Sequence, residues 1–226
     1  MIYKFSGSIT DFDYIIGFDL AYHKSGIAIF DIEKRSIVDT FKISIQNGRD
    51  ASIFDLYSTL GAVLDNISIK YPGSILAIKE AMPLQCGKFT TVQTLQQLAK
   101  AHAALDICLY ERPDTYFVYD EVGIHSISVK SLFRKSKEDK PTKQDIQNRL
   151  REIYNLDGFE ITDDISDAIA VIHTLINKKW NSDIKEEIKA TKKEIKELKQ
   201  DFTIKNKQRY IDYLKDIMIE EVCENG

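Results

Sequence analysis

The chain has 226 residues, of which 43% are hydrophobic and 29% charged, a balance typical of a globular protein with a substantial core. No uncharged apolar run approaches the roughly 20 residues that a membrane-spanning helix needs. Residues 1–8 contain no apolar segment of the secretory-signal type. We therefore expect a cytoplasmic protein with no membrane partner.

The formal net charge of -4 hides two basic segments. Residues 130–151 contain eight basic residues (Lys or Arg) and three acidic ones (Asp or Glu). Residues 178–209 contain eleven basic and six acidic residues. Such local excesses indicate contact with a polyanion, because phosphate binding depends on where the cations lie; two solvated helix faces are the alternative. The three cysteines are scattered and form no C-x-x-C pair, which argues against a disulfide framework and a zinc site.

The first half of the chain begins with strands. Residues 13–20, 26–32 and 36–45 are short β-branched and aromatic runs joined by polar turns, so they predict three antiparallel strands. Residues 51–71 carry apolar residues at helical spacing up to Pro72-Gly73. The almost continuously apolar run at 74–80 then predicts a buried strand, parallel to a neighbour.

The same reasoning predicts a helix over 91–109, a strand over 115–119 and a short helix over 128–133. Pro141 suits the first turn of a helix that runs to about Tyr154. Thr162 or Asp163 can cap a last core helix. Beyond Lys178 a heptad stripe on a Lys/Glu-rich background predicts a helical tail, which pairs with a second chain or folds back on the body.

The order β-β-β-α-β-α-β-α-α predicts an α/β protein of the ribonuclease H-like fold. We expect a five-stranded mixed sheet, three strands antiparallel and then two parallel, flanked by helices. The predicted domains are a nuclease domain at 1–177 and a charged helical C-terminal extension at 178–226.

Four acids stand at positions that can converge. Asp19 ends the first strand, Glu80 ends the fourth, and Asp164 and Asp167 lie one turn apart on the last core helix. Close carboxylates repel one another, whereas a hard divalent cation stabilises them. These residues therefore predict Mg²⁺, with Mn²⁺ as a substitute and two ions per site, for phosphodiester hydrolysis. Taken singly, Asp19 can be a turn residue and Asp164 part of a helix cap.

Several segments resemble, in order and spacing, the motifs of RuvC-type Holliday-junction resolvases, in particular the divergent phage and poxvirus members. They are IIGFDLAYHKSGIAIFD (15–31), LAIKEAM (76–82), SVKSLF (128–133), PTKQDIQNRL (141–150) and DDISDAIAVIHT (163–174). The resemblance implies a homodimeric, Mg²⁺-dependent endonuclease that nicks two opposing strands of a four-way DNA junction in a bacterial or viral host cell. The family's four metal-binding acids match Asp19, Glu80, Asp164 and Asp167, and its two lysines match Lys130 and Lys143. Asp163 comes one residue before the third of these acids and matches none of them, which leaves open a role in the outer coordination shell.

The loop between the two lysines departs from the family. The loop is cationic where the family is rich in glycine. The candidate DNA contacts are the basic residues of this loop together with the lysine on either side of it, namely Lys130, Arg134, Lys135, Lys137, Lys140 and Lys143. The aromatic that the family tends to carry after the second acid is missing. Phe89 is the nearest aromatic candidate to stack on bases, and Met82 or Leu84 could insert as an apolar wedge instead. Packing into the sheet or a dimer contact is the alternative for Phe89.

Other functions remain open on the sequence alone. A branched-DNA-binding protein without cleavage would use the basic segments and not the acids. A related nuclease acting on RNA is also possible. An actin-like or sugar-kinase ATPase begins with a similar strand and Asp, but Asp19 is followed by no phosphate-binding glycines, so we expect no nucleotide cofactor. The helix at 91–109 is the candidate contact of the homodimer.

Overall fold

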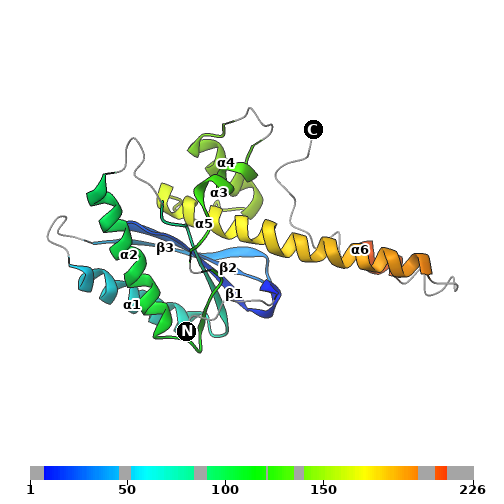
Figure 1. Ribbon diagram of the computed structural model, residues 1–226, viewed down its shortest axis with the longest axis horizontal. Helices are drawn as coiled ribbons and strands as arrows, with labels where there is room; N and C mark the ends of the chain where they lie inside the picture. The colour runs from blue at the N-terminus through cyan, green and yellow to red at the C-terminus, as the bar shows by residue number, and fades with distance from the viewer. Residues whose placement is uncertain are drawn as a thin grey trace.

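The computed structural model describes residues 8–45, 52–83, 91–120, 122–134, 140–197 and 207–212. Five strands form one mixed sheet: β1 (Tyr14–Asp19), β2 (Lys24–Asp31), β3 (Ser36–Ser44), β4 (Ile75–Lys79) and β5 (Tyr116–Val118). The spatial order is β3-β2-β1-β4-β5 (Figure 1). β1 pairs antiparallel with β2 and β2 with β3, whereas β4 is parallel to both β1 and β5. The predicted fold class is confirmed.

The helices are α1 (Ile53–Lys70), α2 (Val92–Tyr110), α3 (Ser126–Leu132), α4 (Lys143–Tyr154), α5 (Asp163–Leu175) and α6 (Asn181–Glu197). α1 and α2 cover one face of the sheet, and α5 crosses the other face with α3 and α4 beside it (Figure 1). Each face of the sheet has its own core, because side chains alternate along a strand.

Alternation decides which residues of the central strands face α5. Ile16 and Phe18 of β1 belong to the core under α1 and α2, whereas Ile15 belongs to the core under α5. β4 alternates in the same way, with Leu76 and Ile78 on the α5 side. The next residues in this register, Asp19 on β1 and Glu80 after β4, therefore come out on the α5 face.

α5 lies against the sheet so closely that two strand positions have room only for glycine. A Cβ atom on Gly17 would lie 2.6 Å from the carbonyl oxygen of Ala168. A Cβ on Gly26 would lie 2.1 Å from the carbonyl oxygen of Asp164. Glycine inside a strand marks such a close backbone approach, and here it seats the N-terminal half of the helix on β1 and β2.

The start of α4 differs from the prediction by two residues. Thr142 is the N-cap, and its side chain forms a capping box with Asp145, so the helix begins at Lys143. Pro141 precedes the cap and does not lie in the first turn, because the Thr142 hydroxyl already accepts from the Asp145 N–H. Of the two caps considered for α5, Thr162 is the one used.

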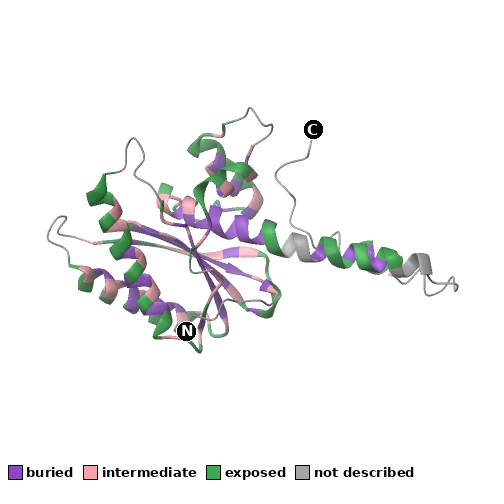
Figure 2. Cartoon of the chain, viewed as in Figure 1, coloured by how far each residue is buried: buried purple, intermediate pink, exposed green. Residues whose placement is uncertain are grey.

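The C-terminal region continues α5 without a loop. A π-helical turn at Ile176–Trp180 joins α5 to α6, and the boundary expected after residue 177 falls inside this turn. Buried positions recur along α6 (Figure 2), and Ile184, Ile188 and Thr191 of the predicted stripe are among the buried residues. Ile211 is also buried, and the Tyr210 hydroxyl donates to a carboxylate oxygen of Glu187. Residues 207–212 thus lie against α6.

None of the helices in the described ranges is long and apolar enough to cross a membrane.

Candidate active site

Asp19 and Glu80 are brought side by side by the parallel pairing of β1 and β4. The backbone N–H of Glu80 donates to the carbonyl of Phe18, the residue before Asp19, at 3.0 Å. Glu80 also forms an isolated parallel bridge with Ile124, which continues the sheet past the last regular pair of β4 and β5. Both side chains emerge at the carboxyl ends of their strands, where sites of open α/β sheets are found.

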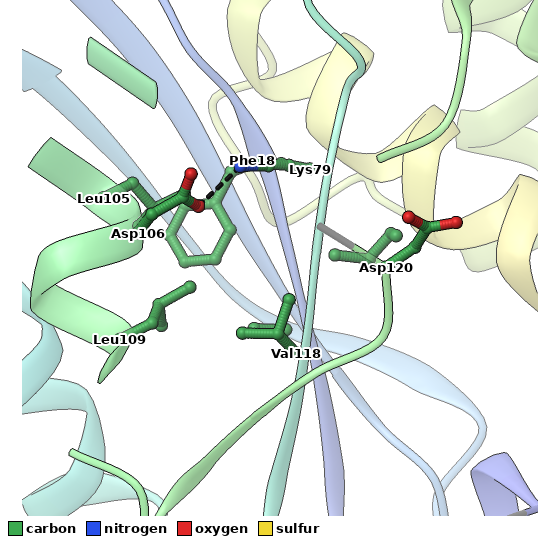
Figure 3. Close-up of a pocket in the computed structure, with 9 residues that line it drawn as sticks. Phe18, Lys79, Leu105, Asp106, Leu109, Val118 and Asp120 are labelled. Carbon is green, nitrogen blue, oxygen red and sulfur yellow. Dashed lines mark hydrogen bonds and ion pairs between the residues drawn. The ribbon is translucent and has the colours of Figure 1, made fainter. Parts of the chain in front are cut away.

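The residue before Glu80 anchors the end of β4 from the other face. The side chain of Lys79 is only 6% exposed and forms an ion pair with Asp106 of α2 (Figure 3). A buried ammonium needs such a partner because desolvation without one is costly. Since neighbouring strand residues point to opposite faces, this anchor leaves Glu80 directed toward α5.

α5 contributes the other two acids from its first two turns. Asp164 and Asp167 are both half-buried and lie one turn apart. Their height above the sheet is set by Gly26, which is the register partner of Asp19 in β1–β2 and lies under the backbone of Asp164. One short contact therefore couples the position of α5 to the strand end that carries Asp19.

The four carboxylates act on one another electrostatically. Burial raises the pKa of Asp19 from 3.8 to about 8, and the negative charges of Glu80, Asp167 and Asp164 add to this shift in that order. Burial is also the largest cause of the raised pKa of Glu80, followed by the charge of Asp167. The neighbouring Asp19 side chain and the charges of Lys130 and Lys143 act in the opposite direction and lower the pKa of Glu80.

Both predicted lysines lie beside these acids. Lys143 is the first residue of α4, and its Nζ lies 2.9 Å from Oδ2 of Asp167. The hydrogen bond to Asp167 raises the pKa of Lys143, so the ammonium stays charged. Lys130 is exposed on α3, and its charge acts on Glu80 to lower the pKa of that carboxyl. The four acids and Lys143 thus lie together, and the charge of Lys130 acts on the same cluster.

The donor set of this cluster suits a hard divalent cation. It consists of carboxylate oxygens, and burial, followed by the charges of the neighbouring carboxylates, raises the pKa of Asp19 to about 8. A bound cation would offset the repulsion between these carboxylates. As the side chains lie, no three His, Cys, Asp or Glu groups among the described residues form a ready ligand group, and Lys143 forms an ion pair with Asp167. The acids therefore fit such an ion in the chemistry of their donor atoms.

The remaining predicted DNA contacts are only partly described. Arg134 is half-buried just after α3, and Lys140 is exposed just before α4. Lys135, Lys137 and Phe89 lie outside the described residues. Arg134 and Lys140 thus lie along the chain between Lys130 and Lys143.

Two side chains next to the cluster, Gln147 and Asp163, were not predicted from the sequence as members of the centre. Gln147 of α4 donates a 2.7 Å hydrogen bond to Oδ1 of Asp163, the first residue of α5. The sequence placed Asp163 as a bystander by register, with an outer-shell role open, and did not single out Gln147. Its position one turn after Lys143 was the available signal, since residues four apart share a helix face.

Neither a protein-family model nor a curated protein matches this sequence. Solved structures do match. Thermus thermophilus RuvC in complex with a Holliday junction substrate has a TM-score of 0.53 and 12% identity, over 71% of this chain and 90% of that one. Another T. thermophilus RuvC structure has a TM-score of 0.53 and 12% identity, and the match covers 71% of this chain and 92% of that one. The yeast mitochondrial Holliday junction resolvase Ydc2 has a TM-score of 0.49 and 14% identity, and the match covers 71% of this chain and 76% of that one. The chain has the ribonuclease H-like fold of RuvC.

Proposed function

We propose that this protein is a structure-selective DNA endonuclease that resolves four-way junctions, and other branched DNA, by metal-dependent phosphodiester hydrolysis. One observation carries the proposal. Asp19, Glu80, Asp164 and Asp167, which come from three separate parts of the chain, act on one another at the carboxyl ends of β1 and β4. The RuvC-like fold supports the same reading, because RuvC has been solved with a Holliday junction substrate.

The four acids would hold Mg²⁺, or Mn²⁺ in its place, and two ions per site suit this reaction class. When bound, such ions activate water and neutralise charge on the phosphate that is attacked. The protein contributes the geometry. β1 and β4 fix Asp19 and Glu80 to the sheet, while α5 presents Asp164 and Asp167 from above.

The two lysines would bind and orient the scissile phosphate. The side chain of Lys143 is 63% exposed although its ammonium rests on Asp167, so it can move to an incoming anion. It also begins α4, where unpaired backbone N–H groups favour negative charge. Lys130 approaches from the side of Glu80. Both ammonium groups would meet the negative charge that gathers on the phosphate in the transition state.

The binding surface would extend beyond the centre. Lys130, Arg134, Lys140 and Lys143, with Lys135 and Lys137 outside the described residues, would contact the DNA backbone. A four-way junction offers two equivalent strands, so a two-fold dimer with two centres fits it. We place the dimer contact on α2, where Val92, Ile107 and Tyr110 are 65%, 48% and 63% exposed. Phe89, in the segment before α2, would stack on bases at the junction.

The proposal is tested by nicking of a panel of labelled DNAs that contains a four-way junction, a fork, a flap and a linear duplex. We expect Mg²⁺ and Mn²⁺ to support paired nicks in the junction and Ca²⁺ to support binding alone. Glu80→Gln is expected to bind the junction as the wild type does and to leave it intact. Gln144→Leu, at an exposed position of α4, is the folded control and is expected to cleave.

Two results would overturn the proposal. The first is a wild-type protein that nicks no branched DNA with either ion. The second is nicking that Glu80→Gln does not reduce, because the activity would then come from elsewhere. Salt-sensitive junction binding without any cleavage would instead favour a branched-DNA-binding protein whose acids are structural.

A further inference from the structure

Lys143 depends on its surroundings to reach the acid cluster. A lysine side chain has four rotatable methylene groups, and ordering it costs conformational entropy. The side chain of Lys143 is 63% exposed, and its ammonium forms a 2.9 Å ion pair with Asp167. An exposed pair of this kind is weak on its own. The place of the ammonium therefore depends on how α4 is held against α5.

Apolar packing holds the middle and the end of α4. Ile146, Leu150 and Tyr154 are buried in the core that also contains α5. The Tyr154 hydroxyl shares a 2.9 Å hydrogen bond with Nδ1 of His173 near the end of α5. These contacts pack α4 on α5 from Ile146 onward, and the Lys143 side chain extends beyond them to Asp167.

A polar contact joins the two helices beside this packing. Nε2 of Gln147 donates to Oδ1 of Asp163 at 2.7 Å. Gln147 lies one turn after Lys143 on α4, and Asp163 lies one turn before Asp167 on α5. Two contacts one turn apart on both helices thus join α4 to α5, namely Lys143 to Asp167 and Gln147 to Asp163. Rotation or sliding of the first turn of α4 would break both at once.

Asp163 also contributes charge. Its carboxylate lies near enough to Lys143 to favour the charged ammonium, after the larger effect of Asp167. Asp163 can therefore act in two ways, as a hydrogen-bond acceptor for Gln147 and as a negative charge near Lys143. Asparagine at this position keeps the acceptor oxygen and removes the charge, which separates the two effects.

Resting on the proposed function, we propose that Gln147 and Asp163 are positioning residues, whose hydrogen bond between α4 and α5 holds the Lys143 ammonium at the acid cluster for contact with the DNA phosphate. They touch neither the phosphate nor the ions themselves. Their effect passes through Lys143 alone.

The test compares single-turnover nicking of a four-way junction with junction affinity in Ca²⁺. Gln147→Leu and Asp163→Ala remove the contact and are expected to slow nicking roughly three- to tenfold, the effect of one hydrogen bond, with affinity unchanged. Asp163→Asn retains the acceptor and is expected to stay within about twofold of the wild type. Gln144→Leu is the matched control, because the Gln144 side chain donates its hydrogen bond to Asn148 within α4 and not to α5.

A double-mutant cycle identifies the route of the effect. In a Lys143→Ala background we expect Gln147→Leu to cause no further loss of rate. An equal fold loss in both backgrounds, or a wild-type rate in Gln147→Leu, would overturn the proposal.

A metal-free measurement keeps this inference apart from the proposed function. The ¹⁵N NMR signal of the Lys143 ammonium is expected to be that of a restrained group in the wild type and in Gln144→Leu, and to broaden in Gln147→Leu. An identical signal in all three proteins would overturn the positioning role even if the wild type cleaves junctions. The expected pattern in a protein that cleaves nothing would support the positioning role and reject the nuclease.

Discussion

Gly26 on β2 lies directly beneath the backbone of Asp164 on α5, where a Cβ atom would come within 2.1 Å of the Asp164 carbonyl oxygen. Gly26 is also the register partner of Asp19. The same residue therefore fixes the distance between the strand that carries one acid and the helix that carries two others. Its lack of a side chain is a requirement of the site as well as of the fold.

Gly26→Ala tests this close approach. The added methyl meets backbone and not a flexible side chain, so α5 must shift, and we expect a loss of about 1–3 kcal/mol in the free energy of unfolding. The displaced Asp164 should also reduce junction nicking more than it reduces binding. Urea unfolding and single-turnover nicking measure the two effects.

Gly158→Ala is the control, because a Cβ there has no atom within 4 Å and its effect should stay within about 0.5 kcal/mol. Equal stability and equal nicking rates in the two variants would show that the sheet and α5 can separate at no cost.

The raised pKa of Asp19 makes the metal-free protein sensitive to pH. Burial and the neighbouring carboxylates move this pKa from 3.8 to about 8. Between those values the folded state keeps a proton that the unfolded state has lost, so stability falls as pH rises, by up to about 1.4 kcal/mol per unit. We therefore expect the wild type in EDTA to be less stable at pH 8 than at pH 5.5.

Asp19→Asn removes this titrating group and should flatten the dependence. It should also make the metal-free protein more stable than the wild type at pH 8, while abolishing nicking. Urea unfolding in EDTA at several pH values measures the slopes. The same slope in both proteins would mean that Asp19 does not carry the proton.

Leu98 tests the dimer contact on α2. Its side chain is half-buried within one chain, and an aspartate there would place a charge in the proposed interface. We expect Leu98→Asp to be monomeric by light scattering while the wild type is a dimer. Gln96→Asp, at an exposed position of the same helix, should leave the dimer intact. A monomeric wild type would contradict the contact.

The basic face of α6 tests the role of the tail. Lys189, Lys192 and Lys193 are exposed and lie three and four residues apart, so they share one face. Changing all three to Gln should weaken junction binding and lower the slope of log affinity against log salt by up to about 0.9 per lost phosphate contact.

Changing the same three lysines to Arg keeps the charge and should preserve both the affinity and the slope. These variants are preferable to a cut after Asn177, which would fall inside the π-helical turn and remove the buried Ile184 and Ile188. An unchanged slope in the Gln variant would leave the tail without a part in DNA binding.

Most of the fold was predictable because local signals agree with the final structure. The apolar run at 74–80 predicted β4, and the heptad stripe predicted a helix whose Ile184 and Ile188 are buried. Pro141 misled the prediction of the start of α4, because proline is favoured in the first helical turn. A Thr-x-x-Asp capping box with Thr142 as the N-cap instead starts the helix at Lys143, two residues later.

The membership of the site was predictable, and its supporting contacts were not. Strand ends and helix spacing predicted that Asp19, Glu80, Asp164 and Asp167 converge. The Gln147–Asp163 bond and the Gly26 contact depend instead on how α4 and α5 pack in three dimensions. Periodicity in the sequence carries no information on such distances between elements.

Whether the four carboxylates of β1, β4 and α5 hold a divalent ion can be seen by anomalous diffraction from crystals of the protein grown with Mn²⁺. We expect a manganese peak in contact with Asp19 and Glu80 and with at least one acid of α5, and a Lys143 ammonium released from Asp167. Crystals in which these carboxylates diverge, or in which manganese binds elsewhere and leaves the cluster without a peak, would contradict this expectation.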